Sequence, residues 1–335
     1  MGDSVGLMAA AGLFTFSAVV VVIAAVALAR GADVIAEKSG WGHVWVGALL
    51  LAGATSLPEF VTDISSVRIG SPALAAGDVL GANMLNMSNL AILTSIFAGR
   101  YLVSKLSRQE MFIAWFAIVL TAIATVIVTV GSSAKLLGPI SVPSLVLLGG
   151  YLVGFRLMGR FASESGDSRG SWADHTLRWG WLVFGAAAAL IFVSGPVVAI
   201  SARSIAELSG ISEGFVGVLG IALVTTLPEL TAAATALRIG VPTLAFAGMF
   251  GTNAFNMAVF GFVDFFSPEG AIFGDLDSSH VAAGAAATAL MLLVLAQFCA
   301  RQRVPRGQRS ALVEAGTFVV VGGYVGALSL VFVLG

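Results

Sequence analysis

Runs of apolar residues long enough to cross a membrane recur along the whole of this 335-residue chain. A helix that spans the hydrocarbon core of a bilayer needs about 20 consecutive apolar residues. Apolar residues make up 58% of the chain and charged residues only 10%, which excludes a soluble domain. We predict an all-α polytopic membrane protein with ten transmembrane helices. The ten runs lie at about 7–29, 43–67, 72–97, 110–130, 139–158, 180–202, 213–237, 242–266, 280–300 and 311–334.

Positive charges are distributed unevenly between the loops that join these runs. If every run crosses the membrane, one side of it holds only Arg68, Lys135 and Arg203, and all other Lys and Arg residues lie on the opposite side. Cytoplasmic loops carry the excess of positive charge, so we expect both termini outside and the polar stretch 159–178 in the cytoplasm. The expected location is the cell (inner or plasma) membrane. The net charge of −1 does not indicate a nucleic-acid partner.

The two halves of the chain repeat one pattern at an offset of 170 residues, without a gap from 36–87 to 206–257. The offset covers five predicted helices, an odd number, so the two copies must enter the membrane in opposite directions. Such an inverted-topology repeat is typical of secondary transporters, which bind their substrates near the midplane. We therefore expect a first repeat at 1–158, a cytoplasmic linker at 159–178 and a second repeat at 179–335.

Each repeat places a proline and a glutamate inside an apolar run, as Thr55-Ser56-Leu57-Pro58-Glu59 and as Thr225-Thr226-Leu227-Pro228-Glu229. A carboxylate at bilayer depth is costly unless it meets a partner, water or an ion. Proline removes a helix hydrogen bond and frees a carbonyl one turn earlier. Carboxylates, carbonyls and hydroxyls are hard oxygen donors, so two facing copies would form a cage for a hard cation. The alternative is a carboxyl paired within the bundle, but the nearest basic residues in sequence, Arg68 and Arg238, lie at helix ends.

The next run in each repeat carries two asparagines, three residues apart. We expect Asn86 and Asn256 to offer carbonyl oxygens to an ion, and Asn83 and Asn253 to hydrogen-bond between helices. The set has no intramembrane histidine, and Cys299 is the only cysteine of the chain. Oxygen ligands alone favour Ca²⁺ and Na⁺ over Zn²⁺ or Cu²⁺. Two carboxylates neutralise one divalent ion, two monovalent ions or two protons, which suits exchange. We expect no cofactor besides the transported ions, Ca²⁺ and Na⁺ or also H⁺.

Two further acids have no counterpart in the other repeat, because Asp63 matches Ala233 and Asp78 matches Gly248. Asp63 lies one helical turn beyond the first glutamate, on the same helix face. In the predicted topology both acids lie toward the outer side of the site. They would either form an outer vestibule that concentrates cations or be acids at helix ends, solvated or paired with Arg68. The sequence leaves both interpretations open.

These motifs resemble those of the cation/calcium exchanger superfamily, whose two repeats carry a Gly-Thr-Ser-Leu-Pro-Glu type motif followed by Gly-Ser-Asn-x-x-Asn. The Thr-Ser-Leu-Pro-Glu form of the motif is similar to that of the sodium/calcium exchanger branch of prokaryotic type. The resemblance is specific over about 36–96 and 206–266. It implies alternating access, in which the first and sixth helices slide past a rigid core of eight helices. Many members are monomeric, so we expect a monomer in the lipid bilayer with small inorganic cations as its partners.

The resemblance also implies a set of ligands. A central Ca²⁺ site would use the Glu59 and Glu229 carboxylates and the Thr55 and Thr225 backbone carbonyls. Asn86 and Asn256 would line the middle, and flanking Na⁺ sites would draw on Ala52, Ser56, Ala222, Thr226 and Thr252.

The chain departs from the family pattern at several positions. Ala54 and Val224 replace the glycine before the threonine, and Ala82 replaces a serine whose hydroxyl would bind Na⁺. Asp78 stands where an asparagine is usual, and Asn256 stands where some members have an acid. The number of Na⁺ ions and the driving ion therefore stay open.

Three functional hypotheses follow. The leading one is an antiporter that exchanges Ca²⁺ for Na⁺ and is not an enzyme. The first alternative is an exchanger coupled to H⁺, or one for another divalent cation, in which Glu59 or Glu229 would take up and release protons. A remote alternative is an intramembrane hydrolase that uses two facing acids, although the chain contains no His-Glu-x-x-His or Gly-x-Gly-Asp signature.

Overall fold

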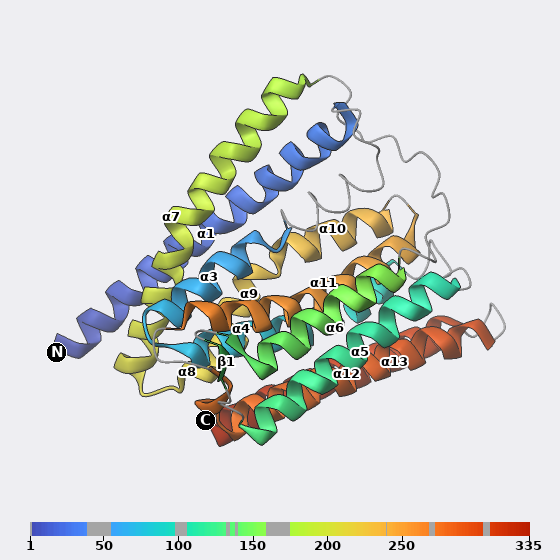
Figure 1. Ribbon diagram of the computed structural model, residues 1–335. Coiled ribbons are helices and arrows are strands. Elements are labelled where there is room, and N and C mark those ends of the chain that lie inside the picture. Colours follow the sequence, from blue (N-terminus) through green and yellow to red (C-terminus); the bar gives the residue numbers. More distant parts are fainter. Residues whose placement is uncertain are drawn as a thin grey trace.

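The computed structural model describes residues 2–38, 55–97, 106–131, 135–137, 140–158, 175–238, 240–267, 272–303 and 309–335, and most of them are helical (Figure 1). An α-helix satisfies its backbone hydrogen bonds internally, as a lipid environment demands. The longer helices are α1 (Gly2–Lys38), α3 (Leu57–Arg68), α4 (Pro72–Ile96), α5 (Arg108–Val130), α6 (Val142–Met158), α7 (Leu177–Ser209), α10 (Leu227–Arg238), α11 (Pro242–Val263), α12 (Ser278–Arg303) and α13 (Arg309–Leu334).

Several short elements join these helices. Between α7 and α10 the chain forms α8 (Glu213–Phe215), the π-helix η1 (Val216–Ile221) and α9 (Ala222–Thr225). Two single 3₁₀ turns, η2 (Asp264–Phe266) and η3 (Ile272–Gly274), follow α11.

Seven of the described helices are long and apolar enough to cross a membrane, namely α1, α4, α5, α7, α11, α12 and α13. The pair Glu213–Thr225 and Leu227–Arg238, which is bent by 47°, would make an eighth candidate if its two parts form one broken span. The apolar helix α6 is shorter, with 17 residues. The predicted run at 43–67 is described only from residue 55 onward. The chain is therefore a helical multi-pass membrane protein, and the count of ten helices stays a prediction.

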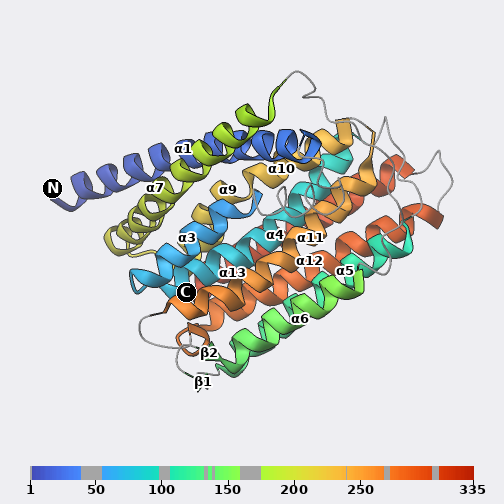
Figure 2. The ribbon, with the colours of Figure 1, turned by 45° about the horizontal axis from the view of Figure 1, so that its top comes forward.

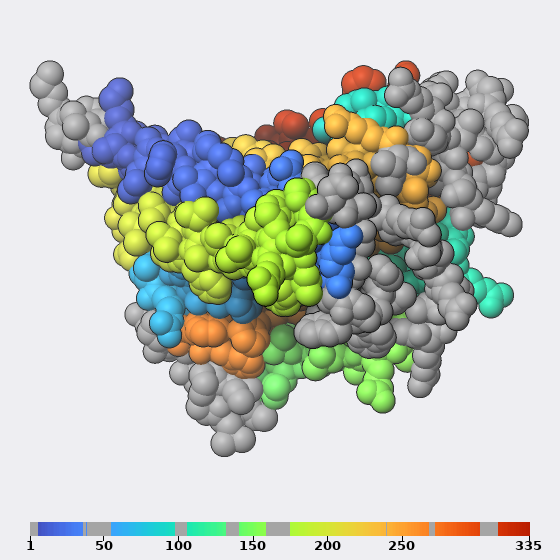
Figure 3. All heavy atoms as spheres, turned by 90° about the horizontal axis from the view of Figure 1, so that it is seen from above, coloured from blue at the N-terminus to red at the C-terminus, as the bar shows by residue number. Residues whose placement is uncertain are grey.

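Helices α1 and α7 are longer than their predicted runs, with 37 and 33 residues. At about 1.5 Å per residue, α1 extends well beyond a hydrocarbon core of about 30 Å. The two helices lie side by side and slant away from the remaining bundle (Figures 1 and 2). In Figure 3 they lie over the left and central part of the face in view. Their contact is close, because a methyl group on Gly31 would lie 2.8 Å from the backbone nitrogen of Phe184.

A short antiparallel hairpin interrupts the helical architecture between α5 and α6. Its strands are β1 (Lys135–Leu137) and β2 (Ile140–Ser141), with Lys135 opposite Ser141 and Leu137 opposite Ile140. The sequence predicted an all-α fold with a helical run from about 139, so this hairpin is a local departure from the prediction. The hydroxyls of Ser141 and Ser144 both donate to the buried carboxylate of Asp264, which ties the start of α6 to the end of α11.

The two halves of the chain repeat local structure as well as sequence. Helix α10 has the bounds of α3 shifted by the repeat offset, and α4 and α11 both begin at the proline that the repeat aligns. Gly70 and Gly240, between these helices, have φ angles of 78° and 84°. This left-handed conformation favours glycine, which explains why both copies keep it.

The hydrophobic core surrounds α4 and α11, the two most deeply buried of the candidate spans. Within their apolar windows, 78% of α4 and 67% of α11 lie inside the protein, against 17% for α13. Helix α4 contacts α3, α11, α12, α13 and η1. The polar side chains of α4 and α11 are therefore held at the centre of the protein, away from lipid.

Candidate cation site

The glutamates of the repeat each lie in the first turn of a helix that follows a break. Helix α3 begins after a turn at Ser56, and α10 begins after a turn at Thr226, which separates it from α9. Pro58 and Pro228 are the second residues of these helices, where a missing N–H costs no hydrogen bond within the helix. Pro228 cannot donate to the carbonyl of Val224, one turn earlier. The positive end of the helix dipole favours the negative charge of each glutamate.

Glu59 and Glu229 are buried, with 1% and 5% of their surface exposed. Their carboxylates lie within direct electrostatic reach of each other. None of the four carboxylate oxygens has a hydrogen-bond partner, and no Lys or Arg in the described part of the chain forms an ion pair with either side chain. Buried, unpartnered carboxylates are costly unless a cation or protons lie between them. The residues present therefore fit a bound cation.

The two threonines of the motif differ in their surroundings. The side chain of Thr55, from the first repeat, approaches the carboxylate of Glu229, from the second. The hydroxyl of Thr225, its counterpart, donates to the carboxylate of Asp78 at 2.9 Å. Asp78 has no equivalent in the second repeat, so it breaks the symmetry of the site.

Four asparagines join α4 to α11. The amide of Asn83 donates to the backbone carbonyl of Asn253 at 3.2 Å, and the amide of Asn253 donates to that of Asn83 at 3.2 Å. The predicted helix-to-helix hydrogen bonds of these two residues are thus confirmed. Asn86 donates to the side-chain oxygen of Asn253 at 2.9 Å, and Asn256 donates to that of Asn83 at 3.1 Å. The side-chain oxygens of Asn86 and Asn256 are buried and have no hydrogen-bond partner, so both can coordinate a cation.

Asp63 and Asp78 do not lie where the sequence placed them. Both side chains are fully buried, with 0% exposed, so they form neither an open vestibule nor a solvated helix end in this structure. Arg68 does not pair with Asp63, because its guanidinium carbon lies over the ring of Phe266, 5.7 Å from the ring centroid. In this conformation the burial of the two acids differs from both interpretations, because α3 packs against α4 and α7 and α4 packs against η1.

Comparisons with known proteins match this architecture. The family described as sodium/calcium exchanger protein matches residues 9–156 and 179–333, one segment in each half of the chain. The chain belongs to this sodium/calcium exchanger family. It is 24% identical over 322 residues to the inner membrane protein YrbG of Escherichia coli strain K12, covering 94% of this chain and 96% of the relative.

Two solved exchangers share the fold of this member of the sodium/calcium exchanger family. The H⁺/Ca²⁺ exchanger CAX has a TM-score of 0.67 at 16% identity. The match covers 96% of this chain and 90% of the CAX chain. The sodium-calcium exchanger NCX_Mj has a TM-score of 0.56 at 16% identity, with coverages of 96% and 98%. At these identities the likeness concerns the fold alone. The fold is common to exchangers coupled to either ion, so it does not decide the coupling ion here.

The structure describes four of the five flanking Na⁺ ligands that the resemblance to the sodium/calcium exchanger family implies. The hydroxyl of Thr226 donates to the carbonyl of Ala222 at 2.7 Å, so these two predicted ligands bond to each other. Ser56 is buried and Thr252 is half-buried. Ala52 lies outside the described residues. Ala82 is fully buried and supplies no hydroxyl.

The donor set restricts the kind of metal that this exchanger can hold. Across the described ranges, no three His, Cys, Asp or Glu side chains are grouped to bind one metal ion. A cation between Glu59 and Glu229 would therefore complete its ligands with hydroxyl, amide and carbonyl oxygens. Ca²⁺ accepts such ligands in flexible geometry.

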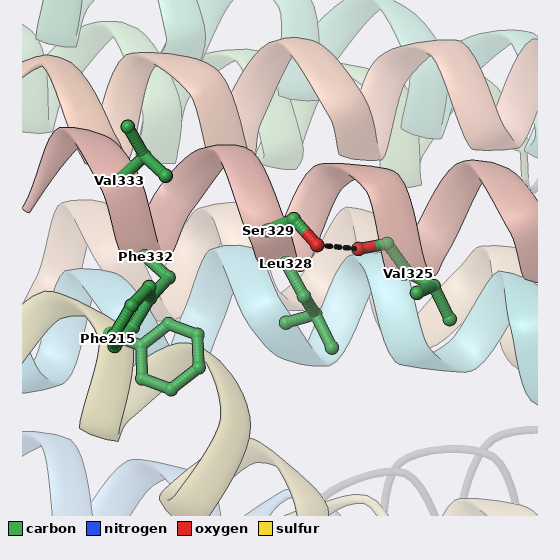
Figure 4. A pocket seen from close by; sticks show the side chains of 6 residues that line it. All are labelled: Phe215, Val325, Leu328, Ser329, Phe332 and Val333. Atoms are coloured by element: carbon green, nitrogen blue, oxygen red, sulfur yellow. Dashed lines mark hydrogen bonds between the residues drawn. The ribbon is translucent and has the colours of Figure 1, made fainter.

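An apolar cavity of about 290 Å³ lies apart from the glutamates, against α13 (Figure 4). Its only hydroxyl, on Ser329, donates to the carbonyl of Val325 one turn earlier in the same helix, at 3.0 Å. The cavity therefore offers little to a cation. Its lining residues are Phe215, Val325, Leu328, Ser329, Phe332 and Val333.

Proposed function

We propose that this member of the sodium/calcium exchanger family is an antiporter that exchanges Ca²⁺ for Na⁺ by alternating access, without covalent chemistry. The observation that carries the proposal is the burial of the unpartnered carboxylates of Glu59 and Glu229, one from each repeat, within reach of each other. Two carboxylates neutralise one Ca²⁺ or two Na⁺, so either ion balances the loaded site. An empty site leaves two buried charges unbalanced, which favours exchange over one-way passage.

Four further residues complete the proposed central site. The oxygens of Asn86 and Asn256 are buried, face no donor and belong to the two most buried helices. The backbone carbonyls of Thr55 and Thr225 stand beside the breaks before α3 and α10, where regular helix hydrogen bonding is interrupted. Together with the two glutamates these groups supply only hard oxygen ligands, which suit Ca²⁺.

The proposed architecture has ten transmembrane helices in two inverted repeats of five, at 1–158 and 179–335. Both termini lie outside, and the linker at 159–178 lies in the cytoplasm of a monomeric exchanger. The matching bounds of α3 and α10 support the repeat. Helices α1 and α7 have only 33% of their apolar windows buried and pack along each other on one face, which supports their role as the sliding pair.

A second candidate is coupling to H⁺ or to another cation in place of Na⁺. The absence of a hydroxyl at Ala82 favours it, because it reduces the set of Na⁺ ligands. In that case Glu59 or Glu229 would carry protons in the return step, while the site for Ca²⁺ would be the same.

Ca²⁺ flux into proteoliposomes under an imposed Na⁺ or H⁺ gradient tests both candidates. We expect flux driven by Na⁺ in the wild type and its loss in Glu59→Gln and in Glu229→Gln, since either change removes half of the balancing charge. The matched control is Glu314→Gln, which neutralises an exposed glutamate of α13 and should transport as the wild type does.

Each outcome assigns the coupling differently. Ca²⁺ flux driven only by a pH gradient would assign the coupling to H⁺, with the same proposed Ca²⁺ site. Undiminished flux in both glutamine variants, with the wild-type ion requirement, would contradict the proposed site.

A further inference from the structure

Asp63 of α3 and Asp78 of α4 form a second pair of buried acids inside the bundle. Both residues have 0% of their surface exposed. Their carboxyl groups face each other within hydrogen-bond reach. Neither oxygen of Asp63 has a hydrogen-bond partner, and Oδ2 of Asp78 has none. Three carboxylate oxygens are thus buried without a donor, in addition to those of the two glutamates.

A close contact between helix backbones fixes the position of Asp78. A methyl group on Gly77 would lie 2.5 Å from the carbonyl oxygen of Gly214, and one on Gly217 would lie 3.0 Å from the backbone nitrogen of Asp78. Only glycine permits this approach of α4 to α8 and η1. It places Asp78 next to Thr225, whose hydroxyl donates to Oδ1 of Asp78 at 2.9 Å.

The described part of the chain supplies no positive charge to this pair. No ion pair found among the described residues includes Asp63 or Asp78. Facing carboxylates in a dry interior repel each other and are poorly solvated. The pair therefore calls for a positive charge that the described residues do not provide.

We infer that Asp63, Asp78 and the Thr225 hydroxyl form a second cation site, which takes a hard cation, Na⁺ or Ca²⁺, beside the Glu59–Glu229 site. The hydroxyl of Thr225 donates its proton to Asp78 and keeps oxygen lone pairs for a cation. Two carboxylates and a hydroxyl are the oxygen ligands that both ions accept. The inference rests on the proposed function only in taking the glutamate pair as the central Ca²⁺ site.

This second site exists in one repeat only. The positions that match Asp63 and Asp78 hold Ala233 and Gly248, which have no ligand atoms in their side chains. A cation here would add to the charge of the loaded protein and would give the two halves unequal roles. Because Ala233 occupies the position of the second repeat that matches Asp63, alanine is a natural substitute for the acid at this helix position.

Equilibrium dialysis of the purified full-length chain in detergent, against ⁴⁵Ca²⁺ and separately against ²²Na⁺, counts bound cations per chain. The variants are Asp63→Asn and Asp78→Asn, with Glu59→Gln to remove central binding and Glu314→Gln as the control. We expect Asp63→Asn and Asp78→Asn each to bind one cation fewer than the wild type while the central ion still binds. We expect Glu59→Gln to lose the central ion.

Several results would overturn the inference. Wild-type cation counts in both aspartate variants would mean that the acids share a proton and bind no cation. Loss of all cation binding in Asp63→Asn, with a wild-type melting temperature, would mean a single merged site. Retained central binding in Glu59→Gln would refute the proposed function, while the counts in the aspartate variants would still decide on the second site. If an asparagine variant does not fold, Asp63→Ala, which copies Ala233, replaces it.

Discussion

Asn83 and Asn253 hold each other by two equivalent hydrogen bonds, in which each side-chain amide donates to the backbone carbonyl of the other at 3.2 Å. The two residues are partners in the sequence repeat and occupy the centres of α4 and α11. The side-chain oxygen of Asn83 also accepts a hydrogen bond from the amide of Asn256, and that of Asn253 accepts one from the amide of Asn86. The pair thus clamps α4 to α11. The side-chain oxygens of Asn86 and Asn256 have no hydrogen-bond partner.

Removing this clamp should cost stability in a non-additive way. Asn83→Ala or Asn253→Ala alone should lower the free energy of unfolding by about 1–2 kcal/mol, because each leaves buried groups unpaired. The double variant should lose less than the sum, since each single change already breaks the shared bonds. Thermal unfolding in detergent measures all three variants. Strictly additive losses would show that the two residues do not act as a pair.

The contact of α4 with η1 predicts different tolerance at two glycines that the repeat aligns. A methyl group on Gly81 would lie 2.5 Å from the carbonyl oxygen of Val218, whereas one on Gly251 would meet nothing within 4 Å. Gly81→Ala should therefore destabilise the protein by about 1–3 kcal/mol. Gly251→Ala should be neutral or slightly stabilising, because alanine favours a helix. Melting temperatures of the two variants check this, and equal effects would refute the close contact.

Asp277 links the start of α12 to a pH effect on stability. Its carboxylate accepts from Nδ1 of His280 at 2.9 Å and from the backbone N–H of Ser279 at 2.9 Å. The hydrogen bond from His280 is the main reason why the pKa of Asp277 lies below its usual range. A lowered pKa means that this stabilisation is present above the ordinary value of about 3.9 and is lost as the pH falls through the lowered pKa.

Asp277→Asn keeps a capping side chain but removes the charge, so it should lower the melting temperature at pH 7. The difference from the wild type should shrink between pH 5 and pH 3. Asp277→Ala, which also removes the cap, should lose about 1 kcal/mol more. Melting curves from pH 3 to pH 7 measure this, and a difference that grows on acidification would contradict it.

The parts of the site that repeat in the sequence were predictable from it. Glu59 and Glu229 stand out because a carboxylate beside a proline has few roles inside an apolar run. The asparagine pairs follow from the same offset, and the structure confirms the bonding of Asn83 and Asn253. Such features depend on local pattern and on symmetry, which one sequence contains.

The parts that depend on packing between helices were not predictable. Asp63 and Asp78 each lie near a helix end in the sequence, but the packing of α3 against α4, and of α4 against η1 through Gly77 and Gly217, buries both. Gly77 and Gly217 were the sequence features that could have indicated this close helix contact. Small residues occur throughout membrane helices, so the two glycines alone do not predict it. The lengths of α1 and α7 were also missed, because hydropathy marks where a helix lies in lipid and not where it ends.

The location of a bound divalent ion tests the central claim most directly. Crystals of the full chain grown with Sr²⁺, an electron-dense substitute for Ca²⁺, would show the ion by anomalous scattering. The account predicts a peak coordinated by carboxylate oxygens of both Glu59 and Glu229, and its absence in Glu229→Gln. A Sr²⁺ peak that contacts neither glutamate, or one unchanged in that variant, would contradict the account.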